Sequence, residues 1–137
     1  WQYPAETLAI GKGDGEDCAF LLASLLRASG ISPFCVRVVF GVLSEYDGNS
    51  GGHTWPIYKD EKGVWRILES TLDQLPDKWP RADEAAHEDA RPRYFPDICL
   101  NHNHVWTVGK KRRIQKVASY LKNVRRNVSR LSGNCVP

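Results

Sequence analysis

The chain contains a histidine and a carboxylate at a spacing that suits acid–base chemistry. His53 opens a segment rich in strand-forming residues, and Glu69 closes a second such segment sixteen positions later. The run Asp-Glu-Lys-Gly at 60–63 between them has the composition of a hairpin turn. Because adjacent antiparallel strands bring distant residues close together, we expect His53 and Glu69 to meet. A carboxylate behind an imidazole fixes its tautomer, so the pair predicts a general base.

A second group of polar residues stands directly before a long apolar stretch. Asp14, Glu16 and Asp17 come first, and Cys18 follows them. Carboxylates suit the start of a helix, where unpaired amides and the helix dipole favour negative charge. A thiol near a helix start has a lowered pKa, which makes Cys18 a candidate nucleophile. The interpretation that we prefer for Cys18 is a small buried residue in a helix of small and apolar residues.

The cysteines do not indicate a disulfide framework or a metal centre. Cys18, Cys35, Cys99 and Cys135 are few and scattered, and no pair has the spacing of a zinc or redox motif. Cys35 is expected to be a small buried residue. A bridge from Cys99 to Cys18 or to Cys35 is left open. We predict no cofactor.

The elements that must position these residues can be read from the apolar pattern. The stretch after the carboxylates predicts one long helix that runs to about Ser29 and is ended by Gly30. Its apolar residues cover most of the circumference, so we expect a buried helix. Strands are predicted at Phe34–Val42, at 53–59 and at 64–68. Together these elements predict an α+β fold in which a buried core helix packs on an antiparallel sheet.

The other segments of the core carry weaker signals. Glycines in residues 1–13 favour a turn, and residues 73–97 are polar and rich in proline. We expect irregular cover over 73–97, with one short helix around Ala82–Asp89. Val105–Val108 predicts a last strand. Residues 1–109 are therefore predicted to form one core domain.

Charge divides the chain at about residue 110. Residues 1–109 carry all 16 acids and 10 of the 19 Lys and Arg, for a net charge of −6, and residues 110–137 carry the other nine bases. Apolar residues within 110–131 recur at intervals of three and four, which predicts a basic amphipathic helix docked on the core. The alternative is that this helix contacts a partner helix, a nucleic-acid backbone or an anionic membrane surface. Only Tyr120 interleaves the bases, so nucleic-acid binding is poorly supported.

The overall composition is that of a globular protein. Hydrophobic residues make up 42% and charged residues 26% of the sequence, and no apolar run is long enough to cross a bilayer. The chain begins at Trp1 and contains no methionine, from which we expect that residues preceding it have been removed. No compartment is predicted.

The helix start, followed by His-Thr-Trp and by Trp-Arg-Ile-Leu-Glu-Ser-Thr, resembles the transglutaminase-like superfamily, especially its bacterial cysteine proteinase branch, over residues 1–72. Members carry a Gly-Asp-Cys-Glu-Asp type of motif at the start of the core helix, and a histidine and an acid on adjacent strands. The resemblance implies a papain-like fold and hydrolysis or acyl transfer at amide bonds of peptides or proteins. It assigns the base to His53, the orienting acid to Glu69 and the nucleophile to Gly15. It also implies that the neighbourhood of Gln2 helps to hold an oxyanion.

Gly15 has no side chain, so thioester chemistry cannot start from this position. Three explanations are open: a disarmed relative that keeps the pocket as a noncatalytic protein- or peptide-binding module, an active enzyme whose cysteine has been replaced in this sequence, and a substitute thiol at Cys18. We rank Cys18 last because it lies one turn inside the helix, where the dipole is weaker. Asp14 and Glu16 offer hard oxygen ligands for calcium, as in some relatives, although helix capping is the role that we prefer.

Overall fold

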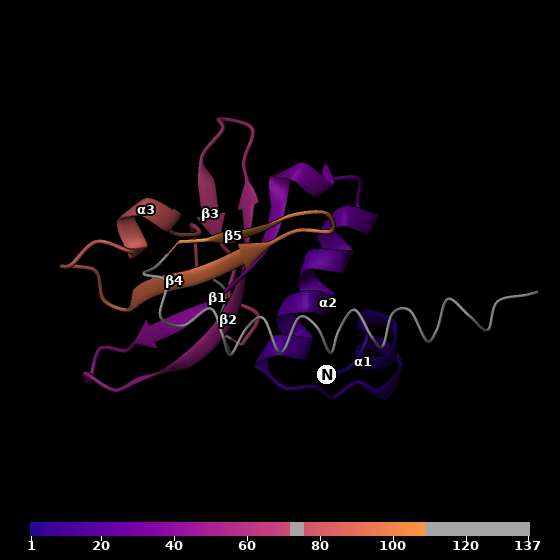
Figure 1. The fold of residues 1–137 in the computed structure, drawn as a ribbon, viewed down its shortest axis with the longest axis horizontal. Coiled ribbons are helices and arrows are strands. Elements are labelled where there is room, and N and C mark those ends of the chain that lie inside the picture. The colour runs from indigo at the N-terminus through magenta and orange to yellow at the C-terminus, as the bar shows by residue number, and fades with distance from the viewer. Residues whose placement is uncertain (72–75, 109–137) are drawn as a thin grey trace, which may run out of the picture.

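The computed structural model describes residues 1–71 and 76–108 and has an α+β fold (Figure 1). Five antiparallel strands form one sheet in the order β3-β2-β1-β4-β5. The strands are β1 Val36–Ser44, β2 Ser50–Lys59, β3 Trp65–Ile67, β4 Arg93–Leu100 and β5 Val105–Thr107. In Figure 1, α2 (Gly15–Ala28) lies at the right of the sheet and α3 (Ala82–Ala85) at its left. The predicted fold class is confirmed.

The hairpins around β2 form as the sequence predicts. β1 pairs with β2 along its whole length, from Val36 opposite Tyr58 to Ser44 opposite Ser50. β2 then returns as β3 through the turn at 60–63, where Gly63 takes a positive φ of 77°. The boundaries of the predicted strands differ from the observed ones by no more than three residues. This hairpin carries His53 and leads into Glu69.

The prediction of a turn over residues 1–13 is wrong, because Pro4–Ile10 forms the helix α1. Pro4 stands at the first helical position, where a missing N–H costs nothing. The Tyr3 amide donates to the Glu6 carboxylate at 2.7 Å, which satisfies another unpaired group at the helix start. Gly11 ends α1 with a φ of 68°. The glycines therefore mark the end of a helix rather than the middle of a loop.

The prediction of irregular cover over 73–97 fails at its end, where β4 forms between β1 and β5. Pro96 hides this strand in the sequence, since proline inside an apolar run argues against a central strand. The structure accommodates Pro96 opposite Gly41, where the register of β1 and β4 shifts. A Cβ at Gly41 would lie 2.0 Å from the carbonyl oxygen of Phe95, so only glycine allows this close approach. The short predicted helix is present as α3, over fewer residues than expected.

The long predicted helix is present as α2, and it packs on one face of β1 and β2. Ala19 and Ala23 are buried against Val36 and Val38 of β1. The prediction that this helix is buried around most of its circumference is wrong in extent, because Leu25 is 47% exposed. Only one stripe of α2 faces the sheet, and that stripe fixes the helix position.

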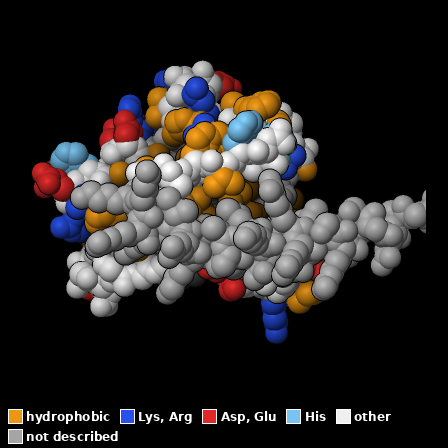
Figure 2. Space-filling view, in the orientation of Figure 1, with side chains coloured by type: hydrophobic (Ala, Val, Ile, Leu, Met, Phe, Trp, Pro, Cys, Tyr) orange, Lys and Arg blue, Asp and Glu red, His pale blue; other side chains and the backbone are white. Residues whose placement is uncertain are grey.

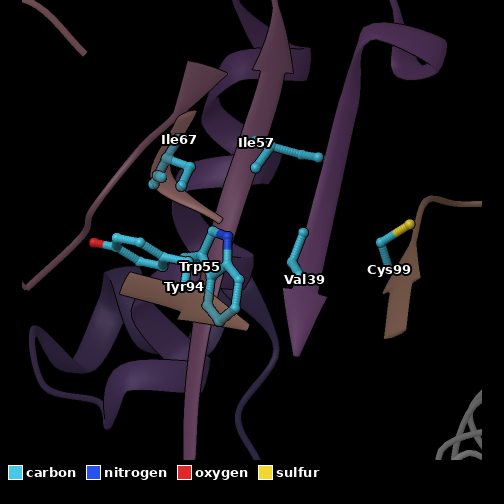
Figure 3. Packing of buried hydrophobic residues seen from close by; sticks show 7 residues of the cluster. Val39, Trp55, Ile57, Ile67, Tyr94 and Cys99 are labelled. Carbon is cyan, nitrogen blue, oxygen red and sulfur yellow. The ribbon is translucent and has the colours of Figure 1, made fainter. Parts of the chain in front are cut away.

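A second hydrophobic cluster lies on the other face of the sheet and includes α3. It is formed by Val39, Trp55, Ile57, Ile67, Ala85, Tyr94 and Cys99. Figure 3 shows the Trp55 and Tyr94 rings against each other, and their centroids are 5.0 Å apart. Because side chains alternate along a strand, Val38 and Val39 of β1 belong to different clusters. The sheet is therefore covered on both faces.

The remaining sequence predictions on cysteines, charge and membranes have different outcomes. Cys18, Cys35 and Cys99 are free, so neither bridge to Cys99 forms. No helix within residues 1–71 and 76–108 is long and apolar enough to cross a membrane. On the uncovered part of the face in Figure 2, acidic and basic side chains are interspersed. The basic helix predicted at 110–137 lies outside the described residues.

Candidate active site

His53 and Glu69 form the pair that the sequence predicts. The Nε2 atom of His53 lies 2.7 Å from Oε2 of Glu69. His53 lies within β2, and Glu69 follows the end of β3, so the 60–63 turn brings them together. The side chain of His53 is 18% exposed and that of Glu69 is 6% exposed. The imidazole therefore keeps contact with solvent, while the carboxylate is enclosed.

Two further side chains hold the Glu69 carboxylate in place. Oε1 accepts from the Thr71 hydroxyl at 2.9 Å, and Oε2 accepts from the Tyr94 hydroxyl at 3.3 Å. Burial alone would raise the pKa of Glu69, but the hydrogen bond and the charge of His53, together with Thr71, hold it below its ordinary value. Glu69 is therefore ionised at neutral pH. For Tyr94 the pKa is raised by burial and by the charge of Glu69, so its hydroxyl stays a donor.

Sequence reasoning missed both of these supporting residues. Thr71 stands two positions after Glu69, a spacing at which a hydroxyl can bond back to a neighbouring side chain, so a local signal was present. Tyr94 belongs to β4, a strand that the residue pattern does not predict. Its contact with Glu69 arises only from the strand order, in which β4 lies on the other side of β1 from β2.

The contact with Glu69 decides which nitrogen of His53 can act as the base. An ionised carboxylate only accepts hydrogen bonds, so Nε2 carries the hydrogen in this pair. Nδ1 of the neutral ring is then left as the acceptor for a proton from a nucleophile. The ring is also held by stacking, because its centroid lies 5.9 Å from that of Trp55 at an interplanar angle of 20°. The pair is thus oriented for general base chemistry through Nδ1.

The start of α2 forms a second polar group. Asp14 accepts from the Asp17 amide at 3.0 Å, and Asp17 accepts from the Asp14 amide at 3.1 Å. Asp17 also accepts from the Gln2 amide at 2.9 Å, which ties the amino-terminal segment to the helix. The pKa of Asp17 is lowered mainly by the Gln2 hydrogen bond. The capping role that the sequence predicts for these carboxylates is confirmed.

Gln2 lies beside this helix start, and its backbone amide and its side-chain oxygen have different surroundings. Its backbone amide is taken by Asp17. Its side-chain oxygen Oε1 is buried and has no hydrogen-bond partner among the described residues. An oxyanion needs donors, and an amide oxygen is an acceptor. The oxyanion role of Gln2 stays a prediction.

Gly15 is the first residue of α2, and nothing in the structure requires glycine there. Its φ is not positive, in contrast to those of Gly11 and Gly30. A Cβ built at Gly15 has no heavy atom within 4 Å apart from its own helix backbone and chain neighbours. The position therefore has room for a cysteine side chain. Cys18 lies one turn farther along the helix and is half-buried.

The dyad, defined as His53 and Glu69, and the helix start come from different elements of the fold. The dyad lies on the Trp55 side of β2, since His53 stacks on Trp55 and alternates with Thr54. The apolar stripe of α2 packs on the opposite face, against Val36 and Val38. No atom of His53 lies within 4 Å of a Cβ built at Gly15, but the sulfur of a cysteine would extend beyond that Cβ. The convergence of the two groups across one crevice therefore stays a prediction.

The described residues do not gather the ligands of a metal centre. Across residues 1–71 and 76–108, no three His, Cys, Asp or Glu side chains form a group that could hold a metal ion. At the helix start, Asp14 uses one carboxylate oxygen and Asp17 uses both in the capping contacts. Calcium usually takes six to eight oxygen ligands. Asp14 and Glu16 alone therefore do not make a complete calcium site.

Comparison with known families gives one match. The sequence pattern of the transglutaminase-like superfamily matches residues 2–70. This range contains Gly15, His53 and Glu69 together with α1, α2 and the first three strands. None of the curated proteins matches the sequence.

Among solved structures, the chain is similar to Legionella pneumophila LapG. The calcium-bound form is 25% identical, with a TM-score of 0.58, and the alignment covers 82% of this chain and 57% of that one. The EGTA-treated form is also 25% identical, with a TM-score of 0.58 and coverages of 81% and 53%. A third LapG structure covers 90% of this chain and 62% of its own, at 25% identity and a TM-score of 0.57. The chain spans between about half and three fifths of LapG.

Proposed function

Because the chain belongs to the transglutaminase-like superfamily, we propose that it carries the frame of a thiol-dependent amide hydrolase or acyltransferase without its nucleophile. The observation that supports this function best is the 2.7 Å contact between His53 and the enclosed Glu69. A buried ionised acid that holds one imidazole nitrogen, with the other free to accept, is the arrangement of a general base. The substrate or ligand is a peptide or protein.

The proposed chemistry needs a thiol at position 15. Nδ1 of His53 would take the thiol proton, and the thiolate sulfur would bond to the carbonyl carbon of an amide. The imidazolium would return the proton to the leaving amine as the carbon–nitrogen bond breaks, which leaves a thioester. Water or a second amine would then release the acyl group. With Gly15 no carbon–sulfur bond can form, so the chain with this sequence lacks the first step.

The second candidate function is a noncatalytic module that binds peptides or proteins. The observation that favours it is Gly15 itself, since the backbone and the space around it would accept a cysteine. Glycine at this position therefore removes the chemistry without serving the fold. A bound peptide could contact the dyad and the helix start without being cleaved.

The variant Gly15→Cys tests the catalytic frame. We prepare it with Cys18→Ala and measure alkylation by iodoacetamide at pH 7, with peptide mapping to identify the modified thiol. A thiol poised by a helix start and an imidazole is expected to react about tenfold faster than an unperturbed one. Adding His53→Ala should return the rate to that of an ordinary thiol. Lys12→Cys serves as the control, because it places an exposed thiol just outside the helix.

The outcomes separate the explanations. A rate at position 15 that equals that of the Lys12→Cys thiol, or that does not depend on His53, would contradict the catalytic frame and leave the binding module. In the unsubstituted chain, a fast reaction at Cys18 that depends on His53 would support the substitute thiol instead. The half-burial of Cys18, one turn inside α2, leads us to expect slow alkylation there.

Calcium is a separate question, because one of the LapG structures is calcium-bound. In this chain the residues that would hold it are Asp14 and Glu16, and they supply two carboxylates at most. We therefore expect dissociation constants of about 1 mM or weaker. Titration calorimetry with calcium chloride, repeated on Asp14→Asn, measures this. Micromolar binding that is lost in Asp14→Asn would show that further ligands complete the site.

A further inference from the structure

Arg37 occupies an unusual position on the sheet face that carries Trp55. Its guanidinium carbon lies 4.3 Å from the centroid of the Trp65 ring and 4.1 Å from that of Trp106. The cation therefore contacts two indole rings, which come from β3 and β5. Such contacts stabilise a guanidinium through the negative ring faces and fix its plane. The arginine side chain is held rigidly before any ligand binds.

The charge of Arg37 has no acidic counterpart among the described residues. Two other arginines do pair with acids: Arg66 with Asp60, and Arg81 with Asp83 and Glu84. The Nε atom of Arg37 is buried and has no hydrogen-bond partner in the described part of the chain. A buried donor of a charged group without a partner is costly in a folded protein. Such a group calls for an acceptor that the described residues do not supply.

The neighbouring thiol does not neutralise this charge. Burial raises the pKa of the Cys99 thiol, and the charge and hydrogen bond of Arg37 only partly oppose that rise. Cys99 is therefore a neutral thiol at physiological pH, and a thiol is a weak hydrogen-bond acceptor. The cation stays without a formal negative charge beside it.

Arg37 forms part of the wall of a cavity of about 400 Å³. The rest of the wall is mostly apolar and includes Val39, Trp65, Tyr94 and Val64. Arg81 and Asp83 also line it, and they pair with each other at 2.7 Å. This volume lies within the range of sites for small molecules, which are usually apolar with a few fixed polar groups. Figure 3 shows three residues of this wall, Val39 on β1 and Tyr94 and Cys99 on β4. An apolar cavity with one unpaired, fixed guanidinium suits a ligand that is apolar apart from one anionic group.

We propose that this cavity binds an apolar carboxylic acid, with the carboxylate on Arg37 and the apolar part against Trp65 and the cavity wall. A planar carboxylate matches the planar fork of a guanidinium, and the paired hydrogen bonds are stronger than neutral ones. The acid can be a free small molecule or the carboxyl terminus of a peptide, since both present the same group. This site uses neither Gly15 nor the dyad, so it stands or falls independently of the proposed amide chemistry.

The test is calorimetric titration of the full chain with 4-phenylbutyrate, and with 4-phenylbutyramide, which differs only in its lack of charge. We expect the acid to bind with a dissociation constant of about 1 mM or tighter. The amide should bind about tenfold to a hundredfold more weakly, since it loses the charged hydrogen bonds. Quenching of tryptophan fluorescence by the acid gives a second readout. Equal binding of acid and amide, or no binding of the acid at 10 mM, roughly ten times the expected constant, would overturn the proposal.

The variant Arg37→Met removes the charge and keeps an unbranched side chain between the two indoles. It should weaken the binding of 4-phenylbutyrate by about tenfold or more and leave the binding of 4-phenylbutyramide unchanged. Arg81→Met is the matched control, because Arg81 lines the same cavity but already pairs with two acids. It should change binding by less than about threefold. Retained acid binding in a folded Arg37→Met, checked by its thermal melting, contradicts the assignment.

Two peptides identify the source of the carboxylate. Acetyl-Ala-Phe is titrated with a free carboxyl terminus and with an amidated one. Tighter binding of the free-terminus peptide than of 4-phenylbutyrate supports a site for chain ends. If the peptide does not bind and 4-phenylbutyrate does, the site takes free acids. If none of the carboxylates depends on Arg37, the proposal is wrong for both sources.

Discussion

Two buried carboxylates in this protein, Glu69 and Asp17, use their charge in different ways. Counting backbone and side chain together, Glu69 is 8% exposed and Asp17 is 5% exposed. Glu69 accepts from the side chains of His53, Thr71 and Tyr94. Asp17 accepts from the backbone amides of Gln2 and Asp14. One acid therefore orients side chains, and the other fixes the course of the backbone.

This difference distinguishes the two halves of the predicted site. The group around Glu69 keeps an imidazole in a defined orientation, which a purely structural acid would not need. The group around Asp17 holds the helix start and the amino-terminal segment in place, and it does so with glycine at position 15. In the proposed site, His53 and Glu69 would supply the acid–base half, while the helix start, with Gly15, would be a scaffold without a reactive atom.

The largest effect on stability is expected from Glu69→Ala. This change leaves the buried partners His53, Thr71 and Tyr94 without their acceptor, so we expect the free energy of unfolding to fall by about 3 kcal/mol. Urea denaturation followed by circular dichroism measures it. The control Glu61→Ala, in the exposed turn, should change stability by less than about 0.5 kcal/mol. Similar losses in both variants would show that Glu69 does not organise this region.

A somewhat smaller effect is expected from Asp17→Ala, which breaks the capping box and the tie to Gln2. Loss of a cap and of one charged hydrogen bond should lower the free energy of unfolding by about 2 kcal/mol. The control is Glu16→Ala in the same helical turn, which should cost about 0.5 kcal/mol through the helix dipole. In addition, hydrogen exchange of the Gln2 and Thr7 amides should accelerate only in Asp17→Ala. Unchanged exchange at Gln2 would contradict a backbone role for Asp17.

Lowering the pH should reduce the free energy of unfolding, because it removes the charge of Glu69. Its folded pKa is below the ordinary value of 4.5, so its stabilisation is complete above that pH and is lost as pH falls through the folded pKa. The change should be smaller than in either alanine variant, because a protonated carboxyl keeps its shape. The free energy of unfolding, measured by urea from pH 6 to pH 3.5, should decline less steeply in Glu69→Gln, which cannot titrate. Equal slopes would show that folding does not lower the pKa of Glu69.

The smallest effect is expected at two glycines, Gly15 at the start of α2 and Gly11 at the end of α1. Gly15→Ala should raise the free energy of unfolding by up to about 0.5 kcal/mol, because the position is helical and open. Gly11→Ala should lower it by about 1 kcal/mol, since a φ of 68° disfavours a side chain. Thermal melting of the two variants gives the comparison. A loss above about 1 kcal/mol in Gly15→Ala would mean that the fold requires glycine there.

The sequence by itself determined the local elements with strong signals. The carboxylates before an apolar stretch located the start of α2, and Asp-Glu-Lys-Gly located the turn that joins β2 and β3. These features are local, because a cap or a turn depends on residues within a few positions of one another. The pairing of His53 with Glu69 followed from that turn.

Only the tertiary structure decided what lies around that pair. Tyr94 reaches Glu69 from β4, a strand that the sequence concealed behind Pro96. Arg37 meets Trp65 and Trp106 because β3 and β5 lie at opposite edges of one sheet whose strands bring these side chains to the same face. The strand register also decides which face of the sheet carries His53 and which face packs against α2. Strand order and register depend on contacts between residues far apart in the chain, so no local pattern of residues encodes them.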